Sequence, residues 1–362
     1  MKKNNQPQSR YKHFKGSQET IYRTDESQKK LVTKALKKIK YKRIAFNLIS
    51  LLLVITIAVS GTLIGKRGVE KFIILRSEME KQKYADIPDD VLKQMEGMTE
   101  EEKWALLYEL YPELINVKFP KGILCEYAVY YYQNPQTIGY IRIPDTKVDY
   151  PVAQADNNKY YLNHDFYGNA TSYGAVFASY KNTWSPLNRN TLLYGHNMED
   201  GSRFAALLNY KNLDYYKKHP IIEFDTIYEK NTWKIVACYI TNGSTASDNG
   251  YFFDFTFNHC SDACYEEYIE EVQKRAIYDT GVDLLPTDTI LTLCTCTYEG
   301  DEGKKIDDGR LVIVARKVRE GEDPSVDTAK ADYKHEPVKY PASYYDDPSE
   351  NPYKDDKNFY LY

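Results

Sequence analysis

Cysteine is scarce in this sequence, with 6 residues among 362. So few cysteines in so long a chain exclude a fold held together mainly by disulfide bonds, which is the architecture of small secreted domains. A cysteine with a special role is therefore expected to act through its chemistry. The six thiols belong to Cys125, Cys238, Cys260, Cys264, Cys294 and Cys296.

The net charge is also small, at −4, and it hides an uneven distribution along the chain. Residues 1–43 contain 14 Lys and Arg against 3 Asp and Glu, a net charge of +11, which leaves −15 for residues 44–362. The hydrophobic content of 42% excludes a wholly disordered chain, because that much apolar surface can form at least one core. The chain therefore has a basic beginning and an acidic remainder.

Charge is absent altogether from residues 44–65, a run of 22 residues. A helix rising about 1.5 Å per residue would span about 33 Å over this run, enough for a hydrocarbon core of about 30 Å. The apolar region of a cleavable signal peptide is shorter, at roughly 7 to 15 residues. We therefore expect an uncleaved transmembrane anchor.

The basic residues 1–43 lie directly before this apolar run. By the positive-inside rule they predict a cytoplasmic N-terminus, with the chain beyond residue 65 outside the cell. Anionic lipid and membrane topology account for a basic segment in this place better than nucleic-acid binding does. The expected localisation is the plasma membrane, as a single-pass protein, and no nucleic-acid partner is expected.

Residues 66–122 have helical patterns. Thr99 and Glu102 match a capping box, which opens a helix with one apolar face. We expect a helical stalk or N-terminal subdomain over residues 66–122. At the other end, residues 319–362 are rich in Asp, Glu, Pro and Tyr without a steady period, which predicts an acidic tail without a core of its own.

The region between them, residues 123–318, contains short β-branched and aromatic runs separated by turn residues. One helix is expected there, over residues 261–276, with an aromatic and aliphatic stripe that packs into the core. This number of short runs predicts a mainly β domain, either a barrel or a sandwich. The expected strands cover residues 138–143, 175–178, 191–194, 221–224, 233–240, 289–293 and 311–315.

Three residues at strand edges have side chains suited to catalysis: His196, Cys296 and Arg310. Cys296 and Arg310 end two apolar runs that a polar loop joins, so hairpin pairing would bring a thiol beside a guanidinium. Gly195 permits a sharp chain turn before His196, whose ring can then project over the same end of a barrel. Each residue taken alone also has an ordinary structural interpretation, and their shared context favours a functional one.

The residues around these three resemble the sortase family of membrane-anchored cysteine transpeptidases. The resemblance rests on Thr-Leu-Cys-Thr-Cys ending at Cys296, Gly-Arg-Leu-Val-Ile-Val containing Arg310, and Tyr-Gly-His-Asn containing His196. It covers roughly residues 123–318. Class B of that family is favoured by further stretches at residues 139–144, 150–152, 158–162 and 164–166, by the helix before the cysteine strand and by the helical N-terminal extension.

The resemblance implies a closed, mostly antiparallel barrel of eight strands, with N-terminal helices and one helix inserted before the cysteine strand. Residues 123–318 would form its catalytic domain, on the extracellular side. It also implies the chemistry of cell-wall anchoring in Gram-positive bacteria. Cys296 would attack the Thr carbonyl of a C-terminal sorting signal of NPQTN or LPXTG type, and an amine of peptidoglycan or its lipid-linked precursor would resolve the thioester.

In that mechanism His196 would act as general acid and then general base, and Arg310 would bind the signal and stabilise the oxyanion. The resemblance implies neither a cofactor nor a metal. Two residues, Asn158 and Leu162, match positions lining the class B substrate groove. Further candidates for substrate contact are Cys294, Thr295 and Glu299.

The sequence departs from the class B pattern in three ways. Cys294 replaces a residue that is often Ser, and Thr297 and Tyr298 precede the acidic Glu299, which often stands nearer the nucleophile. The loop over residues 297–309 is also long. These differences leave the signal preference open.

Residues 134–137, Asn-Pro-Gln-Thr, spell the first four letters of a class B sorting signal. They lie far from the C-terminus and lack the hydrophobic tail that a substrate needs. We expect them to form a turn before the first barrel strand.

Two other functions remain alternatives. One is a pilin-polymerising sortase, in which a Lys side chain resolves the thioester. The other is a non-catalytic membrane-anchored module with a four-cysteine zinc site, because four thiolates suit tetrahedral zinc. That site would use Cys260, Cys264, Cys294 and Cys296, although neither cysteine pair has the usual Cys-x2-Cys spacing.

Overall fold

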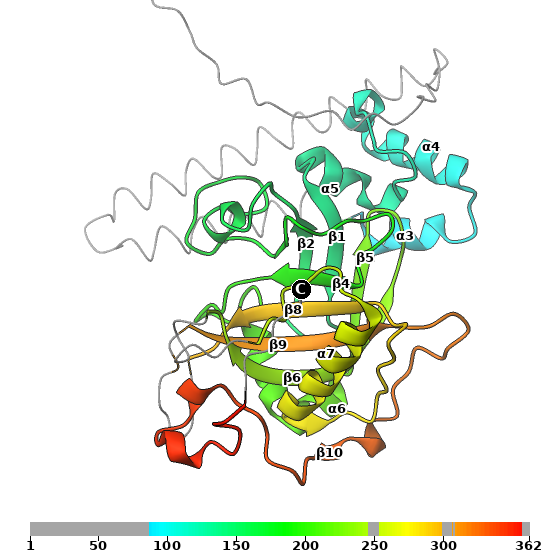
Figure 1. The fold of residues 1–362 in the computed structure, drawn as a ribbon. Helices are drawn as coiled ribbons and strands as arrows, with labels where there is room; N and C mark the ends of the chain where they lie inside the picture. The colour runs from blue at the N-terminus through cyan, green and yellow to red at the C-terminus, as the bar shows by residue number, and fades with distance from the viewer. Residues whose placement is uncertain (1–86, 245–252, 299–305, 307, 357–362) are drawn as a thin grey trace, which may run out of the picture.

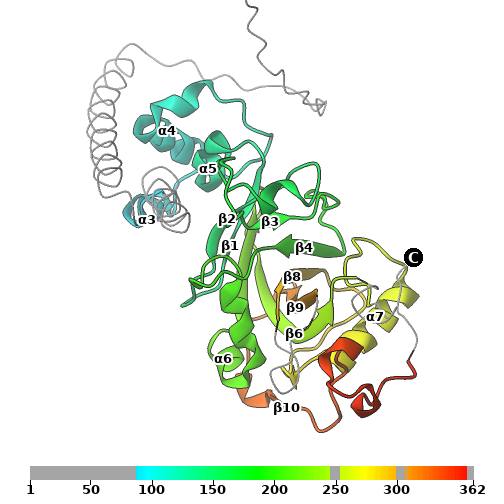
Figure 2. The same ribbon diagram turned by 90° about the vertical axis from the view of Figure 1, so that its left-hand side faces the viewer.

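The short apolar runs pair into a closed barrel of eight strands (Figures 1 and 2). The computed structural model describes residues 87–244, 253–298, 306 and 308–356. Neighbouring strands follow the order β1-β2-β3-β4-β8-β9-β6-β5, and β5 pairs with β1 to close the barrel. The strands are β1 (Thr137–Arg142), β2 (Asp149–Ala153), β3 (Phe177–Ala178), β4 (Asn190–Tyr194), β5 (Ile221–Thr226), β6 (Thr232–Asn242), β8 (Ile290–Cys296) and β9 (Gly309–Lys317).

Six of the eight strand pairs are antiparallel, and β2–β3 and β4–β8 are parallel. The predicted fold class, a closed and mostly antiparallel barrel, is therefore confirmed. The prediction did not include β2, in which Pro151 pairs with Tyr140 of β1. Residues 134–137 form a turn that ends where β1 begins at Thr137, as predicted.

Alternation along the strands gives the barrel two apolar surfaces. In β8, Leu291 and Leu293 lie in the central core, whereas Cys294 lies in a second cluster outside the barrel wall. Helix α7 (Asp262–Arg275) lies over this side of the barrel (Figure 1). It adds buried aromatic side chains to the outer cluster. Its N-cap is Ser261, whose side chain accepts from the Cys264 amide, and its buried stripe confirms the predicted helix.

Short helices lie at two other places around the barrel. The N-terminal helices are α3 (Asp89–Met95), α4 (Glu100–Leu110) and α5 (Ala128–Gln133), while α6 (Leu213–Lys218) precedes β5. Thr99 and Glu102 form the predicted capping box at the start of α4. The packing of these N-terminal helices on one another gives the region before β1 a small core of its own.

No helix in residues 87–244, 253–298 and 308–356 is long and apolar enough to cross a membrane. The predicted anchor, residues 44–65, lies outside the described residues, as does the basic segment 1–43. The prediction of a single-pass plasma-membrane protein is corrected on this finding, since none of the described helices supports it.

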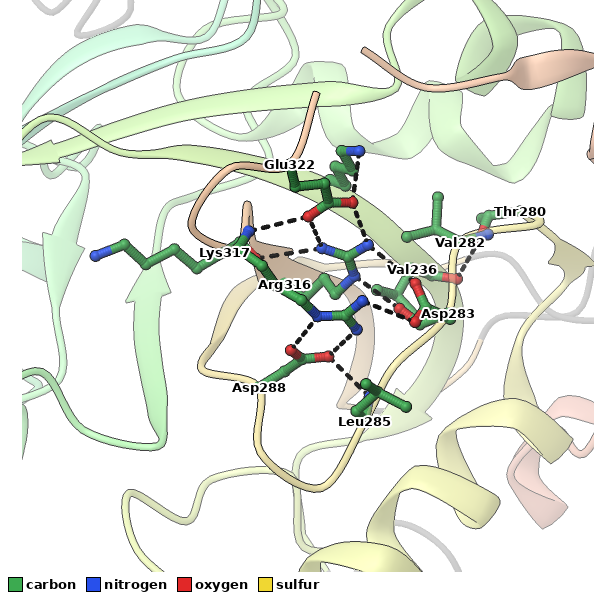
Figure 3. A network of polar contacts seen from close by, with 11 residues as sticks. Val236, Thr280, Val282, Asp283, Leu285, Asp288, Arg316, Lys317 and Glu322 are labelled. Carbon is green, nitrogen blue, oxygen red and sulfur yellow. Dashed lines mark hydrogen bonds and ion pairs between the residues drawn. The ribbon is translucent and has the colours of Figure 1, made fainter. Parts of the chain in front are cut away.

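The acidic tail packs against the barrel. Strand β10 (Asp332–Tyr333) pairs with β7 (Tyr278–Asp279), and Ala331 joins the central core. Glu322 accepts hydrogen bonds from Arg316 and from Lys234, at 2.7 Å in each case, and Figure 3 shows its contact with Arg316. The side chains of these two cations are only 3% and 9% exposed, so the tail supplies the counter-charge for two buried groups of the barrel.

Candidate active site

The last residue of β8, Cys296, lies directly opposite Arg310 near the start of β9. Residues opposite one another in an antiparallel pair project on the same side of the sheet. For this pair it is the outer side, because Cys294, two residues before Cys296, belongs to the outer cluster. Both side chains are half-buried, so the sulfur and the guanidinium are neighbours that solvent can still reach.

The hairpin that carries this pair continues beyond the two strands. The Thr297 amide donates to the Gly309 carbonyl at 3.0 Å, and the Ile306 amide donates to the Tyr298 carbonyl at 3.1 Å. Ile306 is 2% exposed and belongs to the central core. The base of the loop is therefore fixed, and with it the backbone on either side of Cys296 and Arg310.

His196 is held beside the end of β8 by the parallel pair β4–β8. Tyr194 pairs with Cys294, and the Gly195 amide donates to the Cys294 carbonyl at 3.3 Å. The Thr295 hydroxyl then donates to the Gly195 carbonyl at 2.8 Å. These contacts place His196 and Cys296 at the same end of two adjacent strands, as the sequence predicted.

Gly195 is required here for close packing. It does not adopt a left-handed conformation, and a Cβ atom added to it would lie 2.7 Å from Cγ of Phe204. The Phe204 amide in turn donates to the His196 carbonyl at 3.0 Å. The glycine thus lets the chain pass against a fully buried ring, which fixes the backbone of His196.

The His196 ring is oriented by the loop before β3. Its Nε2 atom lies 2.9 Å from the carbonyl oxygen of Leu162. A carbonyl oxygen only accepts hydrogen bonds, so Nε2 carries a proton and Nδ1 is the basic nitrogen of the neutral ring. Gly174 lies against the same ring, and its absent side chain leaves room for it.

The ionisable groups around Cys296 and Arg310 shift one another's pKa values. Burial alone would lower the pKa of Arg310, but the Asp308 carboxylate and the nearby Cys296 and Cys294 side chains, in their ionised forms, outweigh burial and raise that pKa. Burial raises the pKa of Cys294 to about 12, although Arg310 opposes the shift. Cys294 is therefore a neutral thiol at ordinary pH, whereas Arg310 stays charged.

Tyr298 is the second residue after Cys296 and projects on the same side of the hairpin. The charge of the Cys296 thiolate, burial and a hydrogen bond to the Cys296 side chain raise the pKa of the Tyr298 phenol. Its side chain is exposed. A neutral hydroxyl therefore lies next to the thiol at the open edge of the site.

The residues predicted to contact substrate fall in different environments. Leu162 is half-buried and contacts His196 through its carbonyl, while the Asn158 side chain accepts from the Tyr180 amide at 2.9 Å. Cys294 and Thr295 are 4% and 2% exposed, with Cys294 packed in the outer cluster. Glu299 lies outside the described residues.

The four cysteines of the alternative zinc site do not form one. Among the described residues, no three His, Cys, Asp or Glu side chains come together in a way that could hold a metal ion. None of the six cysteines, all of them described, forms a disulfide, and Cys294 is buried beneath helix α7.

The sequence analysis did not identify Asp308 as a site residue, and it did not predict that Tyr298 lies next to Cys296. Asp308 binds the guanidinium of Arg310 through its carboxylate. Both residues stand two positions from a predicted catalytic residue in an expected hairpin. For Tyr298 that spacing, which places side chains on one face of a strand, is the signal that could have found it, whereas Asp308 lies in a left-handed turn before β9.

Comparisons with known proteins agree with this geometry. The model of the sortase domain family matches residues 141–318. Sortase B of Listeria monocytogenes is 34% identical over 185 residues, 51% of this chain and 71% of that protein. Sortase B of Staphylococcus aureus is 33% identical over 186 residues, 51% of this chain and 72% of that protein.

Among solved structures, the Staphylococcus aureus sortase B–substrate complex is similar with a TM-score of 0.50. The similarity covers 68% of this chain and 99% of that one, at 25% identity. The shared fold and an identity of about a third over half of this chain lead to one conclusion. This chain belongs to the sortase family, class B, and is a cysteine transpeptidase.

Proposed function

We propose that this sortase uses Cys296, His196 and Arg310 to cleave a C-terminal sorting signal after its Thr and to transfer the new acyl end to an amine of peptidoglycan. The signal is of NPQTN or LPXTG type. The observation that carries the proposal is the direct pairing of Cys296 with Arg310, together with the bonds that hold Gly195 to Cys294 and Thr295.

In the first step the Cys296 thiolate adds to the Thr carbonyl carbon, and the carbonyl oxygen becomes an oxyanion. Arg310 lies opposite the sulfur and carries a positive charge, which suits it to stabilise that oxyanion. Collapse of the adduct breaks the bond to the following residue and leaves a thioester on Cys296. The amine that departs takes up a proton.

His196 is the proposed source of that proton. Because Nε2–H is held by the Leu162 carbonyl, the proton that is gained and lost is the one on Nδ1. The charged ring gives this proton to the leaving amine, and the neutral ring then takes one from the incoming amine. The new amide forms as the sulfur leaves, and Cys296 returns to its thiolate.

Leu162 and Asn158 are proposed to line the groove for the signal. Both are half-buried on the segment between β2 and β3, and the Leu162 carbonyl adjoins His196. Residues 123–318 are proposed as the catalytic domain. Cys294 and Thr295 are buried, and we propose that they fix the backbone that carries Cys296.

The test is mass spectrometry of the purified protein after incubation with NPQT-, LPXT- and SPXT-type peptides, with Cys296→Ala as the control. We expect one peptide type to add its N-terminal fragment to Cys296 and the control to stay unmodified. If Cys296 is alkylated readily by iodoacetamide but forms no adduct with any of the peptides, the proposed signal class is wrong.

The acceptor is tested by adding amines to the loaded enzyme. We expect an amine that mimics the peptidoglycan cross-bridge to release the thioester as a new amide. If instead only a protein Lys side chain releases it and a ladder of joined subunits forms, the pilin-polymerising alternative holds.

A further inference from the structure

Asp308 and Arg310 form a compact unit at the start of β9. The Asp308 carboxylate binds Nη2 of Arg310, while Nη1 donates to the carbonyl oxygens of Asp308 and Gly309 at 3.1 and 3.0 Å. The two side chains are 34% and 25% exposed, so water screens their ion pair only partly. Three of the five guanidinium N–H groups are thus engaged by the turn that precedes Arg310.

Two N–H groups of Arg310 remain: the second N–H of Nη2 and the N–H of Nε. Within the part of the chain that the structure describes, they have no protein acceptor. Because the other three are taken, the guanidinium has one preferred orientation. The two open donors are the ones that a substrate carbonyl or an oxyanion can engage.

Asp308 is itself fixed by the backbone. It adopts a left-handed conformation with φ of 56°, which Asp tolerates better than most residues, and its carbonyl accepts from the Gly243 amide at 2.9 Å. A Cβ atom on Gly243 would lie 2.7 Å from the Asp308 carboxylate and 2.8 Å from Nη2 of Arg310. The end of β6 therefore leaves just enough room for the acid and the guanidinium together.

Arg310 binds the Asp308 carboxylate and lies opposite Cys296, and each of these side chains is negative when ionised. Both raise the pKa of Arg310 against the effect of burial. The Asp308 charge also contributes to the raised pKa of Cys294, although burial is the main cause. The carboxylate thus offsets part of the positive charge that the guanidinium directs at the thiols.

We propose that Asp308 is a positioning residue for the transpeptidation: it tethers the Arg310 guanidinium and shares its charge with Cys296. The inference rests on the roles proposed above for Cys296 and Arg310. It predicts two separable effects. Loss of the acceptor oxygen frees the guanidinium, whereas loss of the negative charge alone favours the Cys296 thiolate.

Asp308→Gly and Asp308→Asn separate these effects, because both residues accept the left-handed backbone. Gly removes the tether, and we expect kcat/KM for a signal peptide to fall about 10- to 100-fold, mainly through kcat. Asn keeps an acceptor oxygen, and kcat/KM is expected to stay within about threefold of the unmodified protein. Asp149→Asn, which alters a half-exposed ion pair between Asp149 of β2 and Arg142 of β1, is the matched control.

The charge effect is read without any peptide, from the pH dependence of iodoacetamide alkylation of Cys296. In Asp308→Asn we expect the half-maximal rate at a pH lower by roughly half a unit, because a negative charge near the thiolate has gone. The control is expected to match the unmodified protein. Thermal unfolding of each variant shows that the fold is kept, and if Asp308→Gly unfolds, the alkylation profile of Asp308→Asn decides.

Unmodified kinetics and unmodified alkylation in both Asp308 variants would overturn the proposal and leave Asp308 a turn-forming residue. A loss of kcat/KM in Asp308→Asn as large as that in Asp308→Gly would also overturn it. Failure of the proposed function is a different result: the unmodified protein would then form no thioester with any signal peptide, while the alkylation profiles still report on Asp308.

Discussion

The backbone carbonyl of Leu162 accepts a hydrogen bond from Nε2 of His196 at 2.9 Å. This contact ties the histidine that follows β4 to a segment that precedes it by more than thirty residues. Gly174 packs against this hydrogen bond. A Cβ atom at position 174 would lie 2.9 Å from the Leu162 oxygen and 3.0 Å from Cδ2 of His196. The ring orientation therefore depends on a small residue at position 174.

Gly174→Ala is expected to displace the His196 ring and lower kcat/KM for a signal peptide at least about tenfold. The added methyl group would meet the carbonyl oxygens of Tyr161 and Leu162, which are backbone atoms that cannot swing away. Overpacking of this kind typically costs about 1–3 kcal/mol. Steady-state kinetics and thermal unfolding measure the two effects.

Gly168→Ala is the matched control for that variant. Gly168 also has a positive φ, of 81°, but its Cβ atom would meet only the Tyr160 hydroxyl, at 3.4 Å. We expect a similar backbone penalty in stability and an unchanged kcat/KM. If both variants lose activity equally, backbone strain and not the position of His196 is the cause.

Arg310→Lys is expected to lower kcat about 10²- to 10³-fold with a smaller change in KM. A lysine ammonium is a point charge on a flexible chain, and it cannot reproduce the planar set of donors that binds Asp308 and Gly309 while facing Cys296. Cleavage of a fluorogenic signal peptide measures both constants. Arg142→Lys, at a half-exposed ion pair on β1, should leave them unchanged, and a loss there of similar size would contradict the assignment.

Much of the barrel could be predicted from local sequence, because each strand needs only a short apolar run between turn residues. Strand β2 could not, since Pro151 lacks an amide donor and argues against a strand. The structure tolerates Pro151 because β2 pairs along its length with β1 but pairs with β3 only at Ala153. The packing of the tail was equally hidden, because it depends on polar contacts such as Glu322 with Arg316.

The proximity of Cys296 and Arg310 was predictable because two consecutive runs form a hairpin. Placing His196 needed more, since the parallel pair β4–β8 joins residues about a hundred positions apart. The resemblance to a family supplied what the pattern alone did not. The role of Asp308 depends on a left-handed turn and on space left at Gly243, and neither can be read from residue types.

Stability should fall in acid partly through Glu271 on helix α7. Burial would raise the pKa of Glu271, but hydrogen bonds and charges from Lys274, Arg275 and Lys339 outweigh it and lower that pKa to about 2. A depressed carboxyl pKa stabilises the fold fully above about pH 4.5, and the contribution is lost as the pH falls toward 2. It amounts to up to roughly 3 kcal/mol.

Glu271→Gln is therefore expected to reduce the free energy of unfolding near pH 7 and to make little difference near pH 2. Denaturant unfolding at several pH values measures this. Glu267→Gln, at an exposed position on the same helix, should show no such dependence. A loss in Glu271→Gln that stays constant from pH 7 to pH 2 would mean that packing, not charge, is what Glu271 provides.

Ending the chain after Val318 is expected to destabilise the barrel by at least about 3 kcal/mol. The truncation removes Glu322, which is the carboxylate partner of the buried Lys234. Of the two carboxylates that bind Arg316 in Figure 3, Glu322 is lost and Asp283 remains. Removing one partner of a buried ion pair typically costs about 3–5 kcal/mol. A chain that ends after Pro324 retains Glu322 and should recover most of that loss in denaturant unfolding. If the two truncated chains are equally unstable, the tail stabilises the barrel through the contacts of β10 and Ala331 and not through Glu322.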